Sequence, residues 1–228
     1  MIALEPTAAW KTAHPDALIG VLEIAHATNG ASSALEADKR RIEAALRTKY
    51  HGKTRADLVA EPVLGAYVRY YKRFEKTYHV LQQLESVVMK GKSLPSVSPL
   101  VDANFAAELE TLVLTAGHDA AKLQAPVVID ASRTADTMVQ MNGATKTLPE
   151  GDMVMRDAGA IACSILYGQD NRSPITPATT HALYIAYAPV GVSEEAVQRQ
   201  LDGILDYVRK CSPQVTVEQK TVIAAGRG

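Results

Sequence analysis

Two polar residues stand out in residues 90–104, which read KGKSLPSVSPLVDAN. Asp102 and Asn104 follow two prolines and lie on a segment that is otherwise apolar. Ser98 and Pro99 predict that a helix begins there, because serine is common at the N-cap and proline at the first helical position. The question is what chemistry a carboxyl and an amide perform on such a helix.

Several catalytic motifs are absent from the chain. There is no GxxxxGK[ST] loop, no GxGxxG loop and no GxSxG turn, so neither a nucleotide cradle nor a nucleophile elbow is predicted. The six histidines are scattered and show no HxxxH spacing, so we expect no metal site. Cys163 lies in an apolar run, which favours a buried, inert thiol over a nucleophile. An enzyme of this sequence would use water on an already activated substrate, without a cofactor.

Composition places the chain among ordinary globular proteins. Its 228 residues are 47% hydrophobic and 21% charged, which predicts one domain or two intimately packed ones. No apolar run reaches the roughly 18 residues that a membrane span needs. The first residues do not resemble a signal peptide, and Cys163 and Cys211 lie far apart in the sequence and show no metal-ligand spacing. We therefore expect a cytoplasmic protein with reduced thiols.

Charge is distributed unevenly although the net charge is only −1. Residues 1–100 hold 14 Lys and Arg against 10 Asp and Glu, whereas residues 101–228 hold 10 against 15. The basic excess lies in residues 39–55 and 69–76. This asymmetry is typical either of a nucleic-acid surface next to an acidic pocket or of two solvated helix faces.

The hydrophobic period changes along the chain from helical to strand-like. An apolar run at 17–27 predicts a strand, and Ser33 with Glu36 reads as a capping box for a helix that ends near Gly52. Further helices are predicted from residue 62, over 80–91, from residue 98 and after Ser193. Strands are predicted at 126–130, 137–141, 152–157, 159–166, 181–189 and 215–217, with hairpin turns at 142–143 and 158–159. The prediction is an α+β fold with a helical N-terminal half and a mostly antiparallel sheet in the C-terminal half.

Five stretches occur in an order that is hard to obtain by chance. They are HPDALIGVLEI (14–24), YVRYYKRF (67–74), residues 90–104, GHDAAKL (117–123) and LPEGDMVMRDAGAIACSILYGQDNRSPIT (148–176). Together they resemble the B3/B4 domain, the tRNA-editing module of the phenylalanyl-tRNA synthetase beta chain, which also occurs as free-standing proteins. The resemblance covers roughly residues 12–212 and implies the same α+β fold.

The resemblance implies a trans-editing factor that hydrolyses the ester joining a wrong amino acid to the terminal adenosine of a tRNA. Such an ester is an activated substrate, so a positioned water and a few hydrogen-bond donors suffice. The helix starting at PLVDAN would form one wall of the editing pocket. The resemblance implies that water and ester are positioned by Asn104, Ser164, Tyr167, Arg172 and Thr176. The basic residues expected to contact tRNA are Arg69, Lys72, Arg73, Lys76, Lys90 and Lys92.

The chain departs from the family pattern at residues 163–168, CSILYG. Free-standing relatives typically carry an Arg-Arg-Trp-Asn-Trp-like run there, and His118 replaces an aromatic residue. The pocket is therefore expected to be less aromatic and less basic, with Glu108 among its carboxylates. An acidic pocket favours a cationic side chain, and a guanidinooxy group suits carboxylates in bidentate geometry. The residues expected to bind the amino acid are Asp102, His118, Asp119, Asp157 and Asp170.

A free-standing branch of the family resembles the canavanyl-tRNA deacylases, which clear canavanine from arginine tRNA. This activity is the prediction, with mischarged tRNA as partner, no membrane association and no obligate protein partner. Two alternatives are a non-catalytic tRNA-binding module and a sensor of a free amino acid. The predicted organisation is an N-terminal α/β portion (1–97) packed on an editing-like core (98–212), followed by a tail (213–228).

Overall fold

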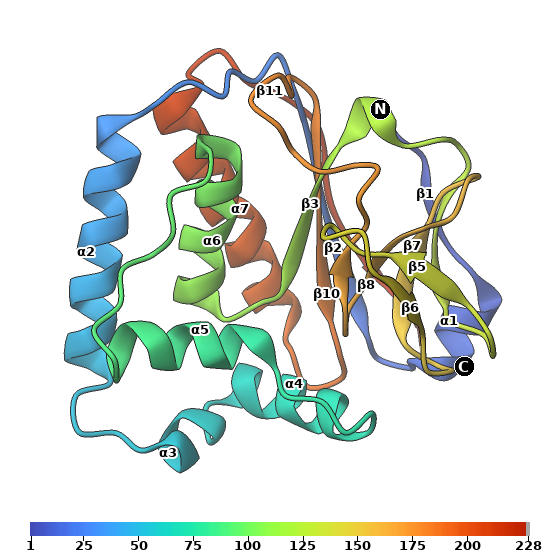
Figure 1. Cartoon of the computed structure of the whole chain (residues 1–228), viewed down its shortest axis with the longest axis horizontal. Coiled ribbons are helices and arrows are strands. Elements are labelled where there is room, and N and C mark those ends of the chain that lie inside the picture. The colour runs from blue at the N-terminus through green and yellow to red at the C-terminus, as the bar shows by residue number, and fades with distance from the viewer. Residues whose placement is uncertain (227–228) are drawn as a thin grey trace.

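A computed structural model describes residues 1–226 and shows an α+β fold, as the sequence predicts. Most helices lie on one side of the molecule and the strands on the other (Figure 1). The helices are α1 (Ala8–Ala13), α2 (Ser33–Lys49), α3 (Arg55–Val59), α4 (Pro62–Lys72), α5 (His79–Val88), α6 (Pro99–Thr111) and α7 (Glu194–Cys211), with a short 3₁₀ turn at Ala120–Lys122.

Two sheets and one small hairpin hold the strands. The four-stranded sheet has the order β11-β2-β10-β3 and the five-stranded sheet the order β1-β4-β7-β8-β9, while β5 and β6 pair with each other. Only β1 and β4 run parallel among these pairs. The strands are β1 (Leu4–Pro6), β2 (Leu18–Ala25), β3 (Thr115–Asp119), β4 (Val127–Ala131), β5 (Thr137–Val139), β6 (Thr145–Thr147), β7 (Met153–Arg156), β8 (Ile161–Ser164), β9 (Gly168–Gln169), β10 (Ala182–Ala188) and β11 (Thr216–Ala224).

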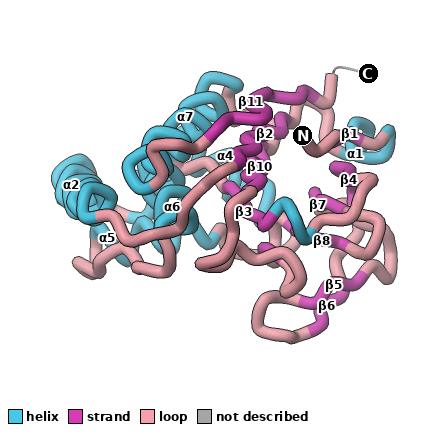
Figure 2. The backbone as a smooth tube through the Cα atoms, turned by 90° about the horizontal axis from the view of Figure 1, so that it is seen from above, coloured by secondary structure: helices cyan, strands magenta, loops and turns pink. Residues whose placement is uncertain are grey.

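The four-stranded sheet lies between the helices and the five-stranded sheet (Figure 2). Every residue of β10 is buried, which explains why ALYIAYA is an unbroken apolar run and not an alternating one. Gly20 in β2 lets α7 pack closely, because a Cβ at this position would lie 2.5 Å from Cγ1 of Val197. The tertiary core is thus built where α6 and α7 cover this sheet.

Two helix starts differ in detail from the prediction. The N-cap of α2 is Ser32, whose Oγ accepts a hydrogen bond from the amide of Leu35, so the predicted capping box at Ser33 is wrong. Glu36 binds Lys39 instead of closing that box. Ser98 does occupy the N-cap of α6, but its side chain makes no capping bond. The capping hydrogen bond comes from Asn29 instead, because Oδ1 of Asn29 accepts from the amide of Leu100.

The end of the described chain is more ordered than the short run at 215–217 suggests. Strand β11 has nine residues and pairs antiparallel with β2. A register shift between Val217 and Gln219 breaks the alternation of side chains, which hides this strand from a period-two search. A hairpin does join β5 and β6 at the predicted place, but its loop is 141–143 and not a two-residue turn, because the amide of Gln140 donates to the carbonyl of Ala144 and only Gly143 has a positive φ, +82°. The last two residues of the predicted tail, 227–228, lie outside the described residues.

The fold also fixes α2 against α6 through a buried ion pair. Nζ of Lys39 lies 2.8 Å from Oδ2 of Asp102, and the two side chains are 1% and 5% exposed. Oδ1 of Asp102 accepts a hydrogen bond from the amide of Val97. The carboxyl of Asp102 therefore holds the entry to α6, which sets the position of the rest of this helix. Within residues 1–226, none of the helices combines the length and the apolar character that crossing a lipid bilayer requires.

Candidate active site

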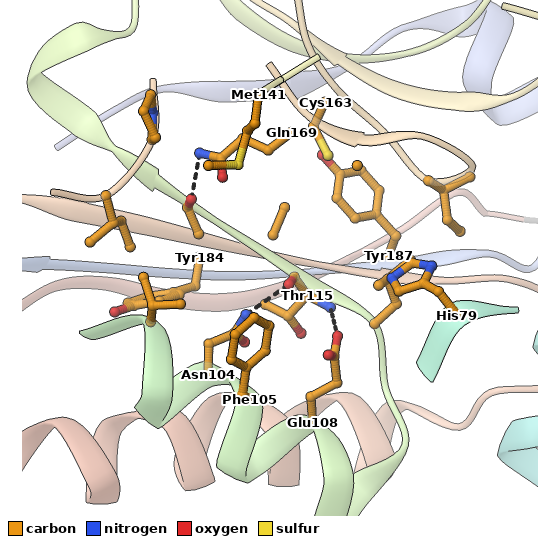
Figure 3. A pocket seen from close by; sticks show the side chains of 18 of the residues that line it. His79, Asn104, Phe105, Glu108, Thr115, Met141, Cys163, Gln169, Tyr184 and Tyr187 are labelled. Carbon is orange, nitrogen blue, oxygen red and sulfur yellow. Dashed lines mark hydrogen bonds between the residues drawn. The ribbon is translucent and has the colours of Figure 1, made fainter. Parts of the chain in front are cut away.

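A cavity of about 340 Å³ lies between α6, the β3–β10 face of the four-stranded sheet, and the β8–β9 segment (Figure 3). Helix α6 lines it with Val101, Asn104, Phe105 and Glu108. These residues have the spacing i, i+3, i+4 and i+7, so they share one face of the helix. The pocket is otherwise mostly apolar. The polar pair noticed in the sequence is therefore split, because Asn104 faces the pocket and Asp102 faces Lys39.

Asn104 is held rigidly in the pocket wall. Its Nδ2 donates to the carbonyl of Thr115 at 2.8 Å, and its Oδ1 accepts from Nε2 of Gln200 at 3.4 Å. Gln200 also donates to Oγ1 of Thr115. The amide thus ties α6 and α7 to the start of β3, and it positions the Thr115 segment that borders the cavity.

Glu108 is the carboxyl that the structure brings to this pocket. It is 2% exposed, and its Oε1 accepts from the amide of Thr115 at 3.0 Å. Its Oε2 has no hydrogen-bond partner in the described part of the chain. Burial raises the pKa of Glu108 to about 8, so the group is mostly protonated at neutral pH. The pocket wall therefore presents an uncharged carboxylic acid that can donate or accept a hydrogen bond.

Glu108 lies toward the interior of the molecule, beside Tyr67, Tyr71 and Tyr78. Burial is the main cause that raises the pKa of each of these phenols. The nearby charge of Glu108 acts in the same direction. The rings of Tyr67 and Tyr78 are stacked with centroids 4.3 Å apart. The carboxyl is therefore at the side of the pocket that faces the tyrosine core.

His79 lies at another edge of the pocket, and its hydrogen bonds fix its tautomer. The hydroxyl of Tyr71 donates its only proton to the carbonyl of Ile165. Nδ1 of His79 lies 3.2 Å from the hydroxyl oxygen of Tyr71, which can therefore only accept from it. Nδ1 must therefore carry a proton, which leaves Nε2 as an acceptor. Burial lowers the pKa of His79 to about 4, so the ring is neutral at physiological pH. No described residue forms a hydrogen bond with Nε2.

Ser164 borders the cavity, and its hydroxyl leads to a second buried acid. Its Oγ donates to Oδ2 of Asp152, while the hydroxyl of Tyr70 donates to Oδ1 at 2.7 Å. Burial raises the pKa of Asp152 to about 7. The Ser164 hydroxyl also accepts from the amide of Tyr167. Since the Ser164 hydroxyl both donates and accepts a hydrogen bond within the protein, its part is to hold the β8–β9 turn beside the pocket.

Cys163 also borders the cavity, but its environment disfavours the thiolate. It is 2% exposed, and burial raises its pKa to about 12. Because the thiolate is the nucleophilic form of cysteine, the side chain is inert at neutral pH.

For the ester hydrolysis that the resemblance implies, we expect Cys163→Ala to keep the rate within a few-fold of the wild-type rate. The physical reason is that its thiol stays protonated and contributes only packing. The measurement is single-turnover release of the amino acid, with the melting temperature as the control for folding. An acyl group trapped on Cys163 of the wild-type protein would contradict the expectation.

Most other residues predicted to bind the amino acid form a separate polar cluster. The guanidinium of Arg172 contacts Asp157 through two bonds of 3.1 Å and lies 2.8 Å from Asp170. His118 Nδ1 lies 2.8 Å from Oγ of Ser173. Asp119 accepts from Thr179 at 2.8 Å. The predicted residues that line no part of the pocket are Asp102, His118, Asp119, Asp157, Asp170, Arg172, Tyr167 and Thr176.

The structure thus differs from the expectation of a pocket rich in carboxylates. Three of the aspartates are satisfied within the loops that follow β3, β7 and β9, because arginine, hydroxyl and amide donors surround them. Burial disfavours the ionised form of Asp157. Hydrogen bonds from Arg172 and from nearby amides favour that form and outweigh burial, so the pKa of Asp157 is lowered. The substrate-binding roles of these residues stay predictions, and the structure assigns them a part in holding these loops.

The basic residues predicted to contact tRNA are exposed and do not gather in one place. Lys92 lines a groove of about 360 Å³ that adjoins the pocket and shares His79, Gln83 and Phe105 with it. Lys76 lies 5.3 Å over the ring of Tyr167. Lys72 and Lys90 are exposed, while Arg69 and Arg73 line a different cleft.

Sequence reasoning missed His79, Thr115, Gln169 and Asp152, and it gave Glu108 only a minor place. A signal did exist for Glu108, because it falls in phase with Asn104 on the same helix. For the others there was none, since their roles depend on contacts between distant segments. Within residues 1–226, no group of three or more His, Cys, Asp or Glu residues is arranged to hold a metal ion.

Comparison with known proteins identifies the family of the chain. The family model of the B3/4 domain matches residues 63–204, which is more than half of the chain, so the chain belongs to the B3/4 domain family. Among solved structures, the chain is similar to an N-terminal fragment of the phenylalanyl-tRNA synthetase beta-subunit from Pyrococcus horikoshii, at 8% identity and a TM-score of 0.46. That match covers 92% of this chain and 51% of the other, so this chain spans about half its length. No curated protein matches the chain.

Proposed function

We propose that the protein is an aminoacyl-tRNA deacylase that hydrolyses the ester of a mischarged tRNA in trans. The observation that carries the proposal is the pair of adjoining cavities, a pocket and a more open groove, which share the lining residues His79, Gln83 and Phe105. The 3′ end of an aminoacyl-tRNA has two parts of this kind, an amino acid and a nucleoside. In this proposal they fill the pocket and the groove respectively.

The groove has the chemistry that a terminal nucleoside requires. Phe105 offers an aromatic surface on which a base can stack, and such stacking tolerates any base. Gln82, Gln83 and Ser86 add polar atoms along α5. Lys92 supplies a cation for a phosphate, and it has no ion-pair partner among the described residues.

With this placement the ester bond lies where the two cavities meet, next to His79. The Nε2 lone pair of the neutral imidazole accepts a hydrogen bond from the attacking water. Water adds to the ester carbonyl, the bond to the ribose oxygen breaks, and the products are a free amino acid and a tRNA with its hydroxyl restored. The ester is activated already, so this positioning needs neither a covalent intermediate nor a cofactor.

In the proposal, Glu108 in the pocket wall selects the amino acid. An uncharged carboxylic acid in an apolar pocket favours a side chain that ends in hydrogen-bonding groups and can bind without a permanent charge. The guanidinium of arginine is always charged, so its desolvation is costly. The guanidinooxy group of canavanine is more acidic than that guanidinium, so it can share a proton with Glu108. Canavanyl-tRNA for arginine is therefore the substrate that we propose.

A deacylation panel tests the proposal with the intact protein and tRNAs charged with canavanine, arginine, tyrosine or alanine. We expect release of canavanine to be fastest. Glu108→Gln should slow it at least about tenfold, because glutamine cannot share a proton with the guanidinooxy group and so loses the charge-assisted bond that proton sharing creates, worth roughly 1.5–3 kcal/mol. The same variant should leave alanine release unchanged, because alanine does not reach Glu108.

Glu110→Gln is the matched control, since Glu110 lies on the same helix but binds Tyr207 outside the pocket. Absence of hydrolysis from every charged tRNA, despite tight and salt-dependent tRNA binding, would replace the deacylase with a non-catalytic tRNA-binding module. Binding of a free amino acid without any binding of tRNA would replace it with a sensor.

A further inference from the structure

A second cleft lies on α4 and shares no lining residue with the pocket or its groove. It measures about 400 Å³ and is formed by residues 13–17 after α1, by α4, and by Pro189 and Val190 after β10. We call it the arginine cleft, because the guanidinium-bearing residues Arg69 and Arg73 of α4 line it.

Both arginines are placed by local packing and neither forms an ion pair within residues 1–226. Eight other arginines of that range each pair with a carboxylate. Arg69 passes close to Gly191, where a Cβ would lie 2.9 Å from its Nη2 and where φ is +98°. Arg73 lies over the rings of Tyr70 and Phe74, at 5.7 and 5.4 Å.

A buried histidine in the same cleft supplies an independent observation. His14 is 5% exposed, and its Nε2 has no hydrogen-bond partner among the described residues. Burial first, and then the charge of Arg73, lowers its pKa to about 4, although the carbonyl of Gly151 acts in the opposite direction. With one ring nitrogen donating to that carbonyl, Nε2 of the neutral ring is an unfilled acceptor beside two cations, and it becomes a donor to an anion when the ring is protonated. Such a polar atom is normally satisfied by a protein group, a water or a ligand.

The charges of the cleft fit an anion with several oxygens, such as a phosphate. Two guanidinium groups outweigh the one carboxylate that lines the cleft, Asp16. Guanidinium groups bind phosphate oxygens through paired N–H donors, and they are weakly hydrated, which lowers the cost of the contact. Tyr70 and Val190 give the cleft an apolar side that suits the organic part of a phosphate ester.

We infer that the arginine cleft is a phosphate-binding site, occupied by a phosphate group that Arg69 and Arg73 hold together beside His14. The group belongs either to the backbone of an RNA or to a free phosphate ester. The inference does not rest on the proposed deacylase activity, because it concerns binding at a cleft that the reaction does not use.

The test follows the imidazole signals of His14 by NMR in the full-length protein. The probes are inorganic phosphate, adenosine 5′-monophosphate and uncharged tRNA. A bound phosphate places negative charge next to the ring, so the pKa of His14 should rise from about 4. Arg69→Gln with Arg73→Gln should weaken the binding at least about tenfold, since each lost charge-assisted bond is worth roughly 1.5–3 kcal/mol.

The matched control is Lys11→Gln with Lys53→Gln, which removes the same charge at exposed positions outside the cleft and should retain binding. A response to tRNA alone would identify RNA as the source of the phosphate, and a response to the small phosphates would identify a free ester. If none of the three probes shifts the His14 signals, or if the control loses binding as the double arginine variant does, the inference is wrong.

Discussion

Replacing His79 by alanine should lower the rate of aminoacyl-tRNA hydrolysis by about 100-fold or more, which is the usual scale for a positioned group that assists proton transfer. The expectation follows from the tautomer that Tyr71 imposes, because only Nε2 is left to accept a hydrogen bond. His79→Gln should recover part of the rate, since its side-chain oxygen can reach the place of Nε2.

The pH dependence separates this role from a structural one. Because the pKa of His79 is lowered to about 4, its neutral form dominates above that value and is lost only as the pH falls through it. The contribution of His79 to the rate should therefore be constant from pH 6 to 8. His51→Ala, at an exposed position after α2, is the matched control. A wild-type rate for folded His79→Ala would show that the water is positioned elsewhere.

Replacing Lys39 by methionine should lower the free energy of unfolding by about 3–5 kcal/mol, which makes it the largest single effect on stability that we expect. The substitution leaves the carboxyl of Asp102 buried without its cation, at the start of the helix that lines the pocket. The measurement is the urea midpoint at constant m-value, read from the far-ultraviolet circular dichroism.

Adding Asp102→Asn to Lys39→Met should restore part of the loss, because asparagine removes the buried charge and still accepts from the amide of Val97. Lys49→Met serves as the control, since Lys49 is on the same helix but its side chain is 54% exposed. If the single Lys39 variant loses less than about 1 kcal/mol, the pair is as weak as an exposed one.

The helices of this fold were predictable because their signals are local. The stripe of Leu64, Tyr67 and Tyr71 predicts α4, and Ser98-Pro99 predicts the start of α6. The sequence could not show that Asn29, some 70 residues away, caps α6 in place of Ser98. Its side chain arrives there only when the connection after β2 is folded.

The site was less predictable for a similar reason. Asn104 could be identified from its place on an apolar helix, and it does line the pocket. Asp157 and Asp170 looked equally suitable as residue types, but their carboxylates are used by Arg172. Which carboxylate remains without a partner depends on the pairing of segments far apart in the chain. His79 therefore emerges only from the three-dimensional arrangement, which also shows that Glu108, in phase with Asn104 on the same helix, is the carboxyl that lines the pocket.

The pairing of β2 has a consequence for how the protein is made. Both neighbours of this strand come late, since residues 18–25 pair with 182–188 and with 216–224. At about 5–20 residues per second, a ribosome takes roughly 10–40 seconds to synthesise the chain that separates them. During that time the apolar segment IGVLEI has no sheet partner from its own chain. We expect newly made protein to depend on chaperones over this interval, and folding to finish only after the last strand is released.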